Sequence, residues 1–188
     1  MATSPEVIAA AIRDWRAAAE PLVIAVDGPG ASGKSTVTEL LSRKLELAIV
    51  HSDDFFRAVA TRPPALPESP MHHYYDLERL RREALEPLLA GQQASFRPFD
   101  ERHDRFREEP VTITPAAVIV VEGVASASVE LGDVVTRRIL VSTPLELRTA
   151  RLRKLIAEGA WDDRWLEAEQ RYFQSLGPGH FDLTICGF

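Results

Sequence analysis

The sequence predicts an α/β domain in which a parallel sheet is covered by helices on both faces. Short continuous apolar runs recur along the chain, as is typical of strands that are buried on both faces. Segments with the helical spacing of apolar residues lie between these runs. The chain has 188 residues, the length of one such domain. Strands that alternate with helices in this way usually form a parallel sheet.

The expected elements follow in chain order. The expected strands are the short apolar runs at residues 22–26, 47–51, 117–121, 137–142 and 181–186. The expected helices cover residues 5–20, 34–45, 77–90, 144–158 and 162–176. Their apolar side chains recur with the period of about 3.6 that defines one helical face.

Start and stop signals bound several of these helices. Pro21 ends the first helix, because proline disrupts helical hydrogen bonding. Asp76 can cap the third helix, and Gly91 can end it. Pro144 favours the start of the fourth helix, and Gly159 stops it.

Composition disfavours membrane, secreted and nucleic-acid-binding proteins. No apolar run reaches the ~18 residues of a membrane span, and the first ten residues lack the basic cluster of a signal peptide. The single cysteine, Cys186, cannot form an intramolecular disulfide and fits a reducing cytoplasm. The net charge of −6 disfavours a nucleic-acid partner. We therefore expect a cytoplasmic protein, a monomer or homo-oligomer, that acts on a small molecule.

Residues 28–35, GPGASGKS, match the phosphate-binding pattern G-x-x-x-x-G-K-[ST]. They follow an expected buried strand and open an expected helix, which is the context that this P-loop motif requires. The glycines bring backbone N–H groups close to phosphate oxygens, and the helix N-terminus adds partial positive charge. Lys34 can reach the β- and γ-phosphates, and the Ser35 hydroxyl can bind Mg²⁺. The expected nucleotide-binding residues are Gly28, Pro29, Gly30, Ala31, Ser32, Gly33, Lys34, Ser35 and Thr36.

Two residue counts narrow the choice of nucleotide and the role of Lys34. The chain has no asparagine, so it cannot contain the Asn-Lys-x-Asp element with which GTPases read guanine. This favours ATP. Lysine occurs only at positions 34, 44 and 154, whereas arginine supplies the other positive charges. A lysine in the P-loop therefore suggests a demand for a compact ammonium group.

Carboxylates follow the second and third expected strands. Ligands of such sheets bind at the carboxyl ends of the strands, where Asp53, Asp54 and Glu122 lie. Phosphoryl transfer to an alcohol needs a group that accepts the hydroxyl proton, and Asp53 is the first choice, followed by Asp54. Ser35, Asp53 and Glu122 are the expected Mg²⁺ ligands, directly or through water. The alternatives are a helix cap by Asp53 or Asp54 and a solvated strand end at Glu122.

Together these motifs resemble the uridine kinase-like group of P-loop kinases, relatives of phosphoribulokinase and pantothenate kinase. The resemblance rests on IAVDGPGASGKST, SDDFF, RPFDERHDR and VIVVEGV, which occur in the family's order within residues 22–188. It implies a P-loop NTPase fold of the nucleoside-monophosphate-kinase type, with a five-stranded parallel sheet and a small arginine-bearing lid. It also implies transfer of the ATP γ-phosphoryl group to a hydroxyl, often on a ribose.

A single domain over residues 1–188 is expected, beginning with a helix within residues 1–20. Prolines make residues 57–76 an irregular segment, and loops of that length usually have a function. We expect this segment to be an acceptor-side loop, and residues 145–176 to form the helical lid region.

The resemblance also assigns roles to individual residues. It makes Asp53 the catalytic base and Glu122 the acidic residue beside the metal. Pro98-Phe99-Asp100 resembles the family's Pro-x-Tyr-Asp element, in which an aromatic ring stacks near the acceptor. His103-Asp104-Arg105 resembles its His-x-Arg element, in which the histidine touches the nucleobase, although the spacing from Phe99 is shorter here. The expected acceptor-binding residues are Asp53, Phe56, Tyr75, Asp76, Phe99, His103, Arg105 and Glu122.

Arginines of the fourth helix are expected to act on the phosphates. Arg148 and Arg151 lie three residues apart, and therefore on one helical face, which suits a phosphate clamp. Surface arginines for solubility are the alternative.

We expect an ATP- and Mg²⁺-dependent small-molecule kinase whose acceptor is a nucleoside or a nucleoside-like compound. A vitamin, a sugar or an antibiotic as the acceptor is the first alternative. A nucleotide-binding regulatory ATPase is the second. A polynucleotide kinase is a further reading, against which the acidic balance weighs.

Overall fold

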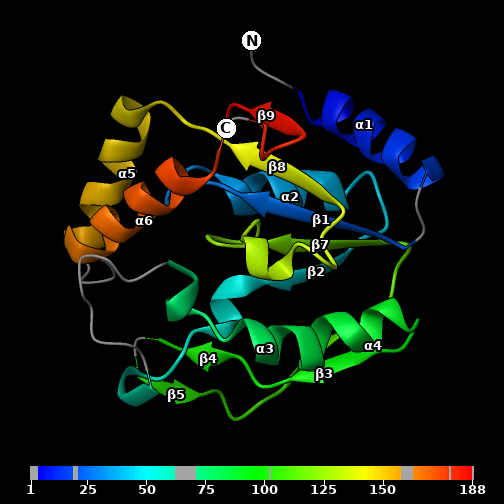
Figure 1. Ribbon diagram of the computed structural model, residues 1–188, viewed down its shortest axis with the longest axis horizontal. Helices are drawn as coiled ribbons and strands as arrows, with labels where there is room; N and C mark the ends of the chain where they lie inside the picture. The colour runs from blue at the N-terminus through cyan, green and yellow to red at the C-terminus, as the bar shows by residue number, and fades with distance from the viewer. Residues whose placement is uncertain are drawn as a thin grey trace.

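The main sheet has five parallel strands, in the computed structural model that describes residues 4–18, 21–61, 71–101, 103–157, 163–177 and 179–187 (Figure 1). In spatial order the strands are β2 (Ala48–His51), β7 (Val118–Glu122), β1 (Leu22–Asp27), β8 (Arg137–Val141) and β9 (Leu183–Ile185). The predicted five-stranded parallel sheet is thereby confirmed. The strand order reverses direction around β1, so the end of β1 is the switch point at which such folds bind ligands.

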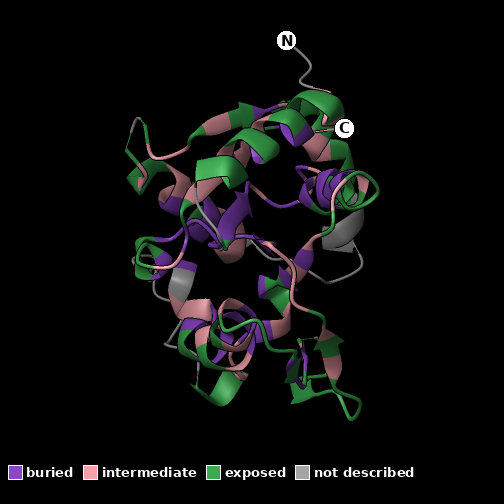
Figure 2. Cartoon of the chain, turned by 90° about the vertical axis from the view of Figure 1, so that its right-hand side faces the viewer, coloured by how far each residue is buried: buried purple, intermediate pink, exposed green. Residues whose placement is uncertain are grey.

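Helices cover both faces of the sheet, as the sequence predicts. Side chains alternate along each strand, so Ile24 and Val26 of β1 enter one core whereas Val23 and Ala25 enter the other. The first core is closed by α1 (Pro5–Ala18) and α2 (Lys34–Ser42). The second is closed by α3 (Leu77–Leu80), the π-helix η4 (Arg81–Leu85), α4 (Glu86–Leu89) and α6 (Asp163–Ser175). Figure 2 shows the buried residues concentrated between these layers.

Two small antiparallel sheets lie beside α3 and α4 (Figure 1). One pairs β3 (Ala94–Phe96) with β6 (Val111–Ile113), and the other pairs β4 (Phe99–Asp100) with β5 (Arg105–Phe106). The sequence analysis did not predict these strands, because two or three residues are too few to show an alternating pattern.

The connecting segments hold short 3₁₀-helical turns. These are η1 (Ser52–Phe55), η2 (Val59–Thr61), η3 (Met71–Tyr74) and η5 (Val129–Leu131). Backbone hydrogen bonds from Arg57 N to Tyr74 O and from Asp76 N to Phe55 O join the two ends of the segment expected to be the acceptor-side loop. Residues 62–70 of that segment lie outside the described ranges.

The last helical region begins with α5 (Leu145–Ala157), which lies beside α6 (Figure 1). Residues 158–162, between these helices, lie outside the described ranges. Within those ranges, none of the helices has the length and apolar character needed to span a membrane.

Candidate active site

The P-loop joins β1 to α2 in a conformation that depends on its glycines. A Cβ on Gly28 would lie 2.3 Å from the carbonyl oxygen of Val141, so a side chain does not fit at this position. Gly33 has a φ of 94° immediately before α2, a left-handed conformation that glycine adopts without strain. The loop therefore approaches the neighbouring strand closely and leads directly into the N-terminus of a helix. This arrangement can bind phosphates through backbone N–H groups.

Lys34 is held at the loop by backbone carbonyls. Its Nζ donates to Gly28 O at 2.8 Å and to Pro29 O at 3.2 Å, and the residue is only 8% exposed. The ammonium group is therefore kept beside the loop rather than extended into solvent. A nucleotide bound on the loop would meet this positive charge directly.

Glu122 connects the P-loop helix to the end of β2. The Ser35 hydroxyl donates to Glu122 Oε1 at 3.1 Å, and His51 Nδ1 lies 2.8 Å from Glu122 Oε2. His51 and Glu122 are partners in the register of β2 and β7. The hydrogen bond to Glu122 raises the pKa of His51, although burial opposes it. Sequence reasoning missed His51, yet its place at a strand end is the signal that would have found it.

Ser35 and Glu122 suit a magnesium ion. The hydroxyl and the carboxylate, which is 5% exposed, are both hard oxygen donors. Among the described residues, no cluster of three or more His, Cys, Asp or Glu side chains could hold a metal ion by itself. Mg²⁺ is usually bound by one or two protein ligands together with substrate phosphates.

Asp53 and Asp54 lie in η1, directly after β2, and differ in their surroundings. The Tyr75 hydroxyl donates to Asp53 Oδ1 at 3.4 Å. The surrounding protein displaces water from around Asp53 and thereby raises the pKa of this carboxyl, whereas the positive charge of Lys34 opposes the shift. The residue is nevertheless exposed at the surface. Burial also raises the pKa of Asp54, and His51 opposes it. Asp53 is therefore the carboxylate that lies within the electrostatic reach of the P-loop lysine.

The residues expected to bind the acceptor fall into two groups. Phe56 and Tyr75 lie together near Asp53, with their ring centroids 4.5 Å apart. Asp76 accepts a hydrogen bond from Arg79 N at 3.0 Å, so it caps α3 as the sequence predicts.

The second group lies on the hairpin formed by β4 and β5. Phe99 is 3% exposed and belongs to the core, and the exposed Phe106 packs edge-on against it. His103 and Arg105 are exposed, and His103 Nδ1 lies 2.8 Å from Asp100 Oδ2. Sequence reasoning missed Arg79, whose guanidinium donates to Asp54 O at 2.7 Å and to Arg97 O at 3.0 Å. It thereby links η1 to the segment between β3 and β4 that leads into this hairpin.

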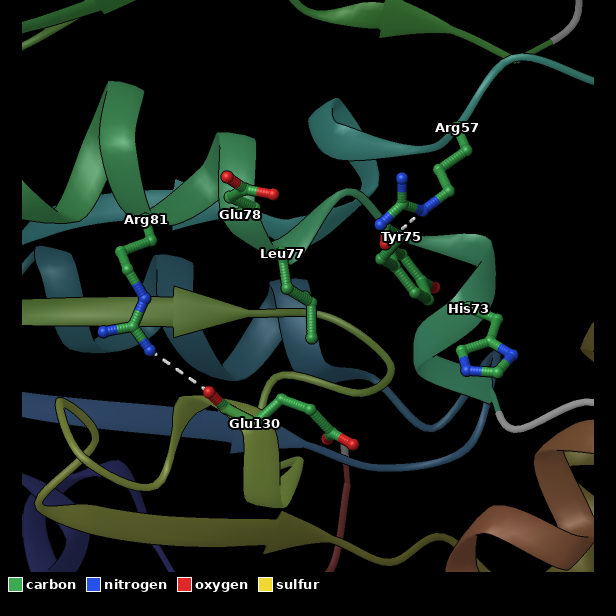
Figure 3. Close-up of a pocket in the computed structure, with 7 residues that line it drawn as sticks. All are labelled: Arg57, His73, Tyr75, Leu77, Glu78, Arg81 and Glu130. Atoms are coloured by element: carbon green, nitrogen blue, oxygen red, sulfur yellow. Dashed lines mark hydrogen bonds between the residues drawn. The ribbon is translucent and has the colours of Figure 1, made fainter. Parts of the chain in front are cut away.

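A cavity of about 280 Å³ borders this site (Figure 3). Its lining residues are Arg57, His73, Tyr75, Leu77, Glu78, Arg81 and Glu130. Arg57 Nε donates to Tyr75 O at 3.0 Å, and Arg81 donates to Glu130 O at 3.1 Å (Figure 3). Tyr75 lines this cavity and also donates its hydroxyl to Asp53, so it connects the cavity to the expected catalytic carboxylate, which is not itself a lining residue.

Arg151 of α5 contacts the P-loop directly, whereas Arg148 of the same helix is joined to it through Glu169. Arg151 donates to Ala31 O at 3.2 Å. Arg148 donates to Glu169 Oε1 at 2.9 Å, and Gly30 N donates to Glu169 Oε2 at 2.6 Å. Sequence reasoning missed Glu169, although a charged residue among the apolar positions of an amphipathic helix is a recognisable signal.

Asp27 ends β1 and holds the base of the P-loop. It is fully buried and accepts hydrogen bonds from Gly28 N at 2.7 Å, from Ala127 N at 3.0 Å and from the Tyr172 hydroxyl at 2.7 Å. Burial raises the pKa of Asp27 to about 6, even though all three donors oppose this shift. Asp27 therefore ties α6 and the segment after β7 to the start of the loop.

Replacing Tyr172 with phenylalanine is expected to destabilise the protein in a pH-dependent way. The change removes one of the donors to a buried carboxylate and should cost about 2 kcal/mol at pH 8, or about 4–8 °C in Tm. The pKa of Asp27 is about 6 in the folded protein, against about 4 when unfolded. Its contribution to stability therefore falls as the pH rises from about 4 to 6 and is constant above. Below pH 6 the Asp27 carboxyl is largely uncharged. The stability lost in Tyr172→Phe should therefore be smaller at pH 5 than at pH 8.

Thermal unfolding at the two pH values measures this effect. Tyr74→Phe leaves the contacts of Asp27 intact and is the matched control. An equal loss for Tyr172→Phe at pH 5 and pH 8 would show that Asp27 does not titrate in this range.

Comparison with known proteins agrees with this geometry. The family model described as cytidylate kinase matches residues 24–135. The uridine kinase of Borrelia duttonii (strain Ly) is 22% identical over 163 residues, which cover 85% of this chain and 78% of that protein. The chloroplastic uridine/cytidine kinase UKL1 of Arabidopsis thaliana is 28% identical over 185 residues, which cover 92% of this chain and 37% of that protein.

A solved structure shows the same fold. The structure of a "possible uridine kinase" from Bacillus stearothermophilus aligns with a TM-score of 0.66 and 21% identity. The alignment covers 93% of this chain and 99% of that one. Because the family model covers more than half of the sequence, the chain belongs to the cytidylate kinase family and is a uridine kinase-like P-loop kinase, a phosphotransferase.

Proposed function

We propose that the protein transfers the γ-phosphoryl group of ATP to a hydroxyl of a small molecule, with a nucleoside or nucleoside-like compound as the acceptor. One observation carries this proposal: the P-loop, the Ser35–Glu122 pair and Asp53 all lie at the carboxyl ends of neighbouring strands. The names of the uridine kinase relatives support a nucleoside acceptor.

The phosphates would bind to backbone N–H groups among residues 31–36, because the N–H groups of Gly28 and Gly30 donate to Asp27 and Glu169. Lys34 would lie beside the β- and γ-phosphates. Ser35 and Glu122 would hold Mg²⁺, which neutralises the charge that develops on the phosphates when it is bound. Arg148 and Arg151 would add positive charge from α5 and exclude water, a competing acceptor.

Asp53 would orient the acceptor hydroxyl and take its proton. Tyr75 donates to Oδ1 of Asp53, which leaves Oδ2 for the hydroxyl. As the acceptor oxygen forms its bond to the γ-phosphorus, the bond from that phosphorus to the β–γ bridging oxygen breaks and ADP leaves. The proton on Asp53 then passes to solvent. A raised pKa suits this role, because it makes the carboxylate a better proton acceptor.

The cavity beside Tyr75 has room for part of a small acceptor. Its lining combines the charged residues Arg57, Glu78, Arg81 and Glu130 with Tyr75 and Leu77. We propose that part of the acceptor occupies this cavity while its reacting hydroxyl lies at Asp53.

A screen of acceptors tests the proposed function. Purified protein with ATP and Mg²⁺ is incubated with a panel of nucleosides, sugars and vitamins, and ADP and phosphorylated products are measured. A nucleoside that gives stoichiometric ADP and monophosphate supports the proposal. Transfer to a sugar or a vitamin alone would overturn the nucleoside assignment, and ADP release that no acceptor stimulates would favour a regulatory ATPase.

A further inference from the structure

Glu169 joins three elements that are far apart in the sequence. It lies on α6, and its carboxylate is shared between two donors, Gly30 N at 2.6 Å and an Arg148 terminal nitrogen at 2.9 Å. The residue is 2% exposed. Each carboxylate oxygen therefore holds a different element: Oε2 holds the P-loop and Oε1 holds α5.

A buried carboxylate in this position requires an explanation. Removing a charge from water is costly unless it is paired and hydrogen-bonded, and an apolar residue would fill the same space on α6 at no such cost. Burial raises the pKa of Glu169, whereas Gly30 N–H, Arg148 and Lys34 oppose the shift. The Glu169 carboxylate therefore lies close enough to Arg148 and Lys34 to interact with both positive charges.

The carboxylate holds one terminal nitrogen of the Arg148 guanidinium. Only one terminal nitrogen of Arg148 is used by Glu169, and the guanidinium carries five N–H donors in a rigid fork. Among the described residues, Arg148 Nε is buried without a hydrogen-bond partner. Because Glu169 holds one terminal nitrogen, the other terminal nitrogen of Arg148 is left to donate to a second anion.

The place of Arg148 indicates which anion this is. The start of α2 and the adjoining loop N–H groups cradle the α- and β-phosphates of a nucleotide, whereas Lys34 reaches the β- and γ-phosphates. Arg148 is joined through Glu169 to Gly30, within the loop that leads to Lys34, and the charge of Lys34 acts on the same carboxylate. The phosphates that Lys34 reaches are therefore the anions that Arg148 can meet.

We propose that Glu169 is a positioning residue that fixes Arg148 on the P-loop for contact with the γ-phosphate of ATP. This inference rests on the proposed function insofar as the loop binds ATP. The competing explanation is that Glu169 only attaches α6 to the P-loop. A purely structural attachment would affect all nucleotides alike, whereas positioning of Arg148 would affect only a nucleotide with a γ-phosphate.

Nucleotide affinities distinguish these explanations without an acceptor. Titration calorimetry with Mg²⁺·AMP-PNP and with Mg²⁺·ADP is carried out on the wild type, Glu169→Ala, Glu169→Gln, Arg148→Ala and the double variant Arg148→Ala/Glu169→Ala. Glu167→Gln is the matched control, because Glu167 is an exposed glutamate of the same helix that pairs with Arg171. Glu169→Gln keeps the shape of the side chain in case Glu169→Ala unfolds, and thermal unfolding reports on folding.

We expect Glu169→Ala to weaken AMP-PNP binding about tenfold and to change ADP binding less than about twofold. Glu169→Gln should show a smaller loss with the same selectivity. Because Glu169 acts through Arg148, the double variant should bind AMP-PNP no more weakly than Arg148→Ala. Glu167→Gln should match the wild type.

Equal losses for the two nucleotides, or losses that add in the double variant, would overturn the positioning role and leave the proposed function intact. Unchanged AMP-PNP affinity in Glu169→Ala would overturn it as well. A wild-type protein that binds neither nucleotide would instead remove the nucleotide site on which both proposals rest.

Discussion

Replacing Asp53 with asparagine is expected to lower acceptor phosphorylation by about 100- to 10,000-fold while ATP affinity changes little. Asparagine keeps the size of the side chain and can still accept the Tyr75 hydrogen bond, but it cannot take a proton from the acceptor. The expected pattern is a loss in kcat with ATP binding retained. Steady-state kinetics with the acceptor found by screening, together with ATP titration, measure the two quantities separately.

Asp54→Asn is the matched control for this variant, because Asp54 is the neighbouring carboxylate of the same turn. We expect it to lower kcat less than about tenfold. The pH profile gives a second readout: burial raises the pKa of Asp53, so wild-type activity should rise with pH through that pKa, and this rise should be absent in Asp53→Asn. A larger loss in Asp54→Asn would transfer the role of base to Asp54.

The sheet and the P-loop could be predicted because their signals are local. Runs such as LVIAV and AVIVV show burial on both faces without any knowledge of their neighbours. The glycines of residues 28–33 are needed by the loop's own geometry, as the close approach of Gly28 to Val141 O illustrates. The boundaries were less exact: α2 ends at Ser42 rather than Leu45, and β9 covers only Leu183–Ile185.

The contacts that surround the loop could not be predicted, because they depend on tertiary structure. Glu169 meets Gly30 across 139 positions of sequence, and Tyr172 meets Asp27 across 145. Both Glu169 and Tyr172 lie on α6 beside buried apolar residues such as Ala168, so the helical pattern alone does not identify their partners. The contact between His51 and Glu122 could have been predicted, unlike the other two. Both residues end neighbouring parallel strands, where they are partners in the register.

Replacing Lys34 is expected to have the other large effect, and arginine should not rescue it. Lys34→Ala removes the charge beside the β- and γ-phosphates and should lower kcat by about 100- to 1,000-fold. Lys34→Arg keeps the charge but must place a planar, larger group where Nζ lies 2.8 Å from Gly28 O and 3.2 Å from Pro29 O. Since the residue is nearly buried, the guanidinium would have to displace the loop that binds the phosphates.

Lys44→Arg is the matched control in a chain that otherwise uses arginine for most of its positive charge. Lys44 lies at the surface and pairs with Glu6 at 2.9 Å, so the exchange should leave kcat and ATP affinity within about twofold. Full activity in Lys34→Arg would mean that the loop needs only a positive charge, and the presence of lysine at this position would then lose its explanation. We expect Lys34→Arg to lower kcat about as much as Lys34→Ala does, while Lys44→Arg leaves kcat unchanged. This result would show that the P-loop requires a compact ammonium group at position 34.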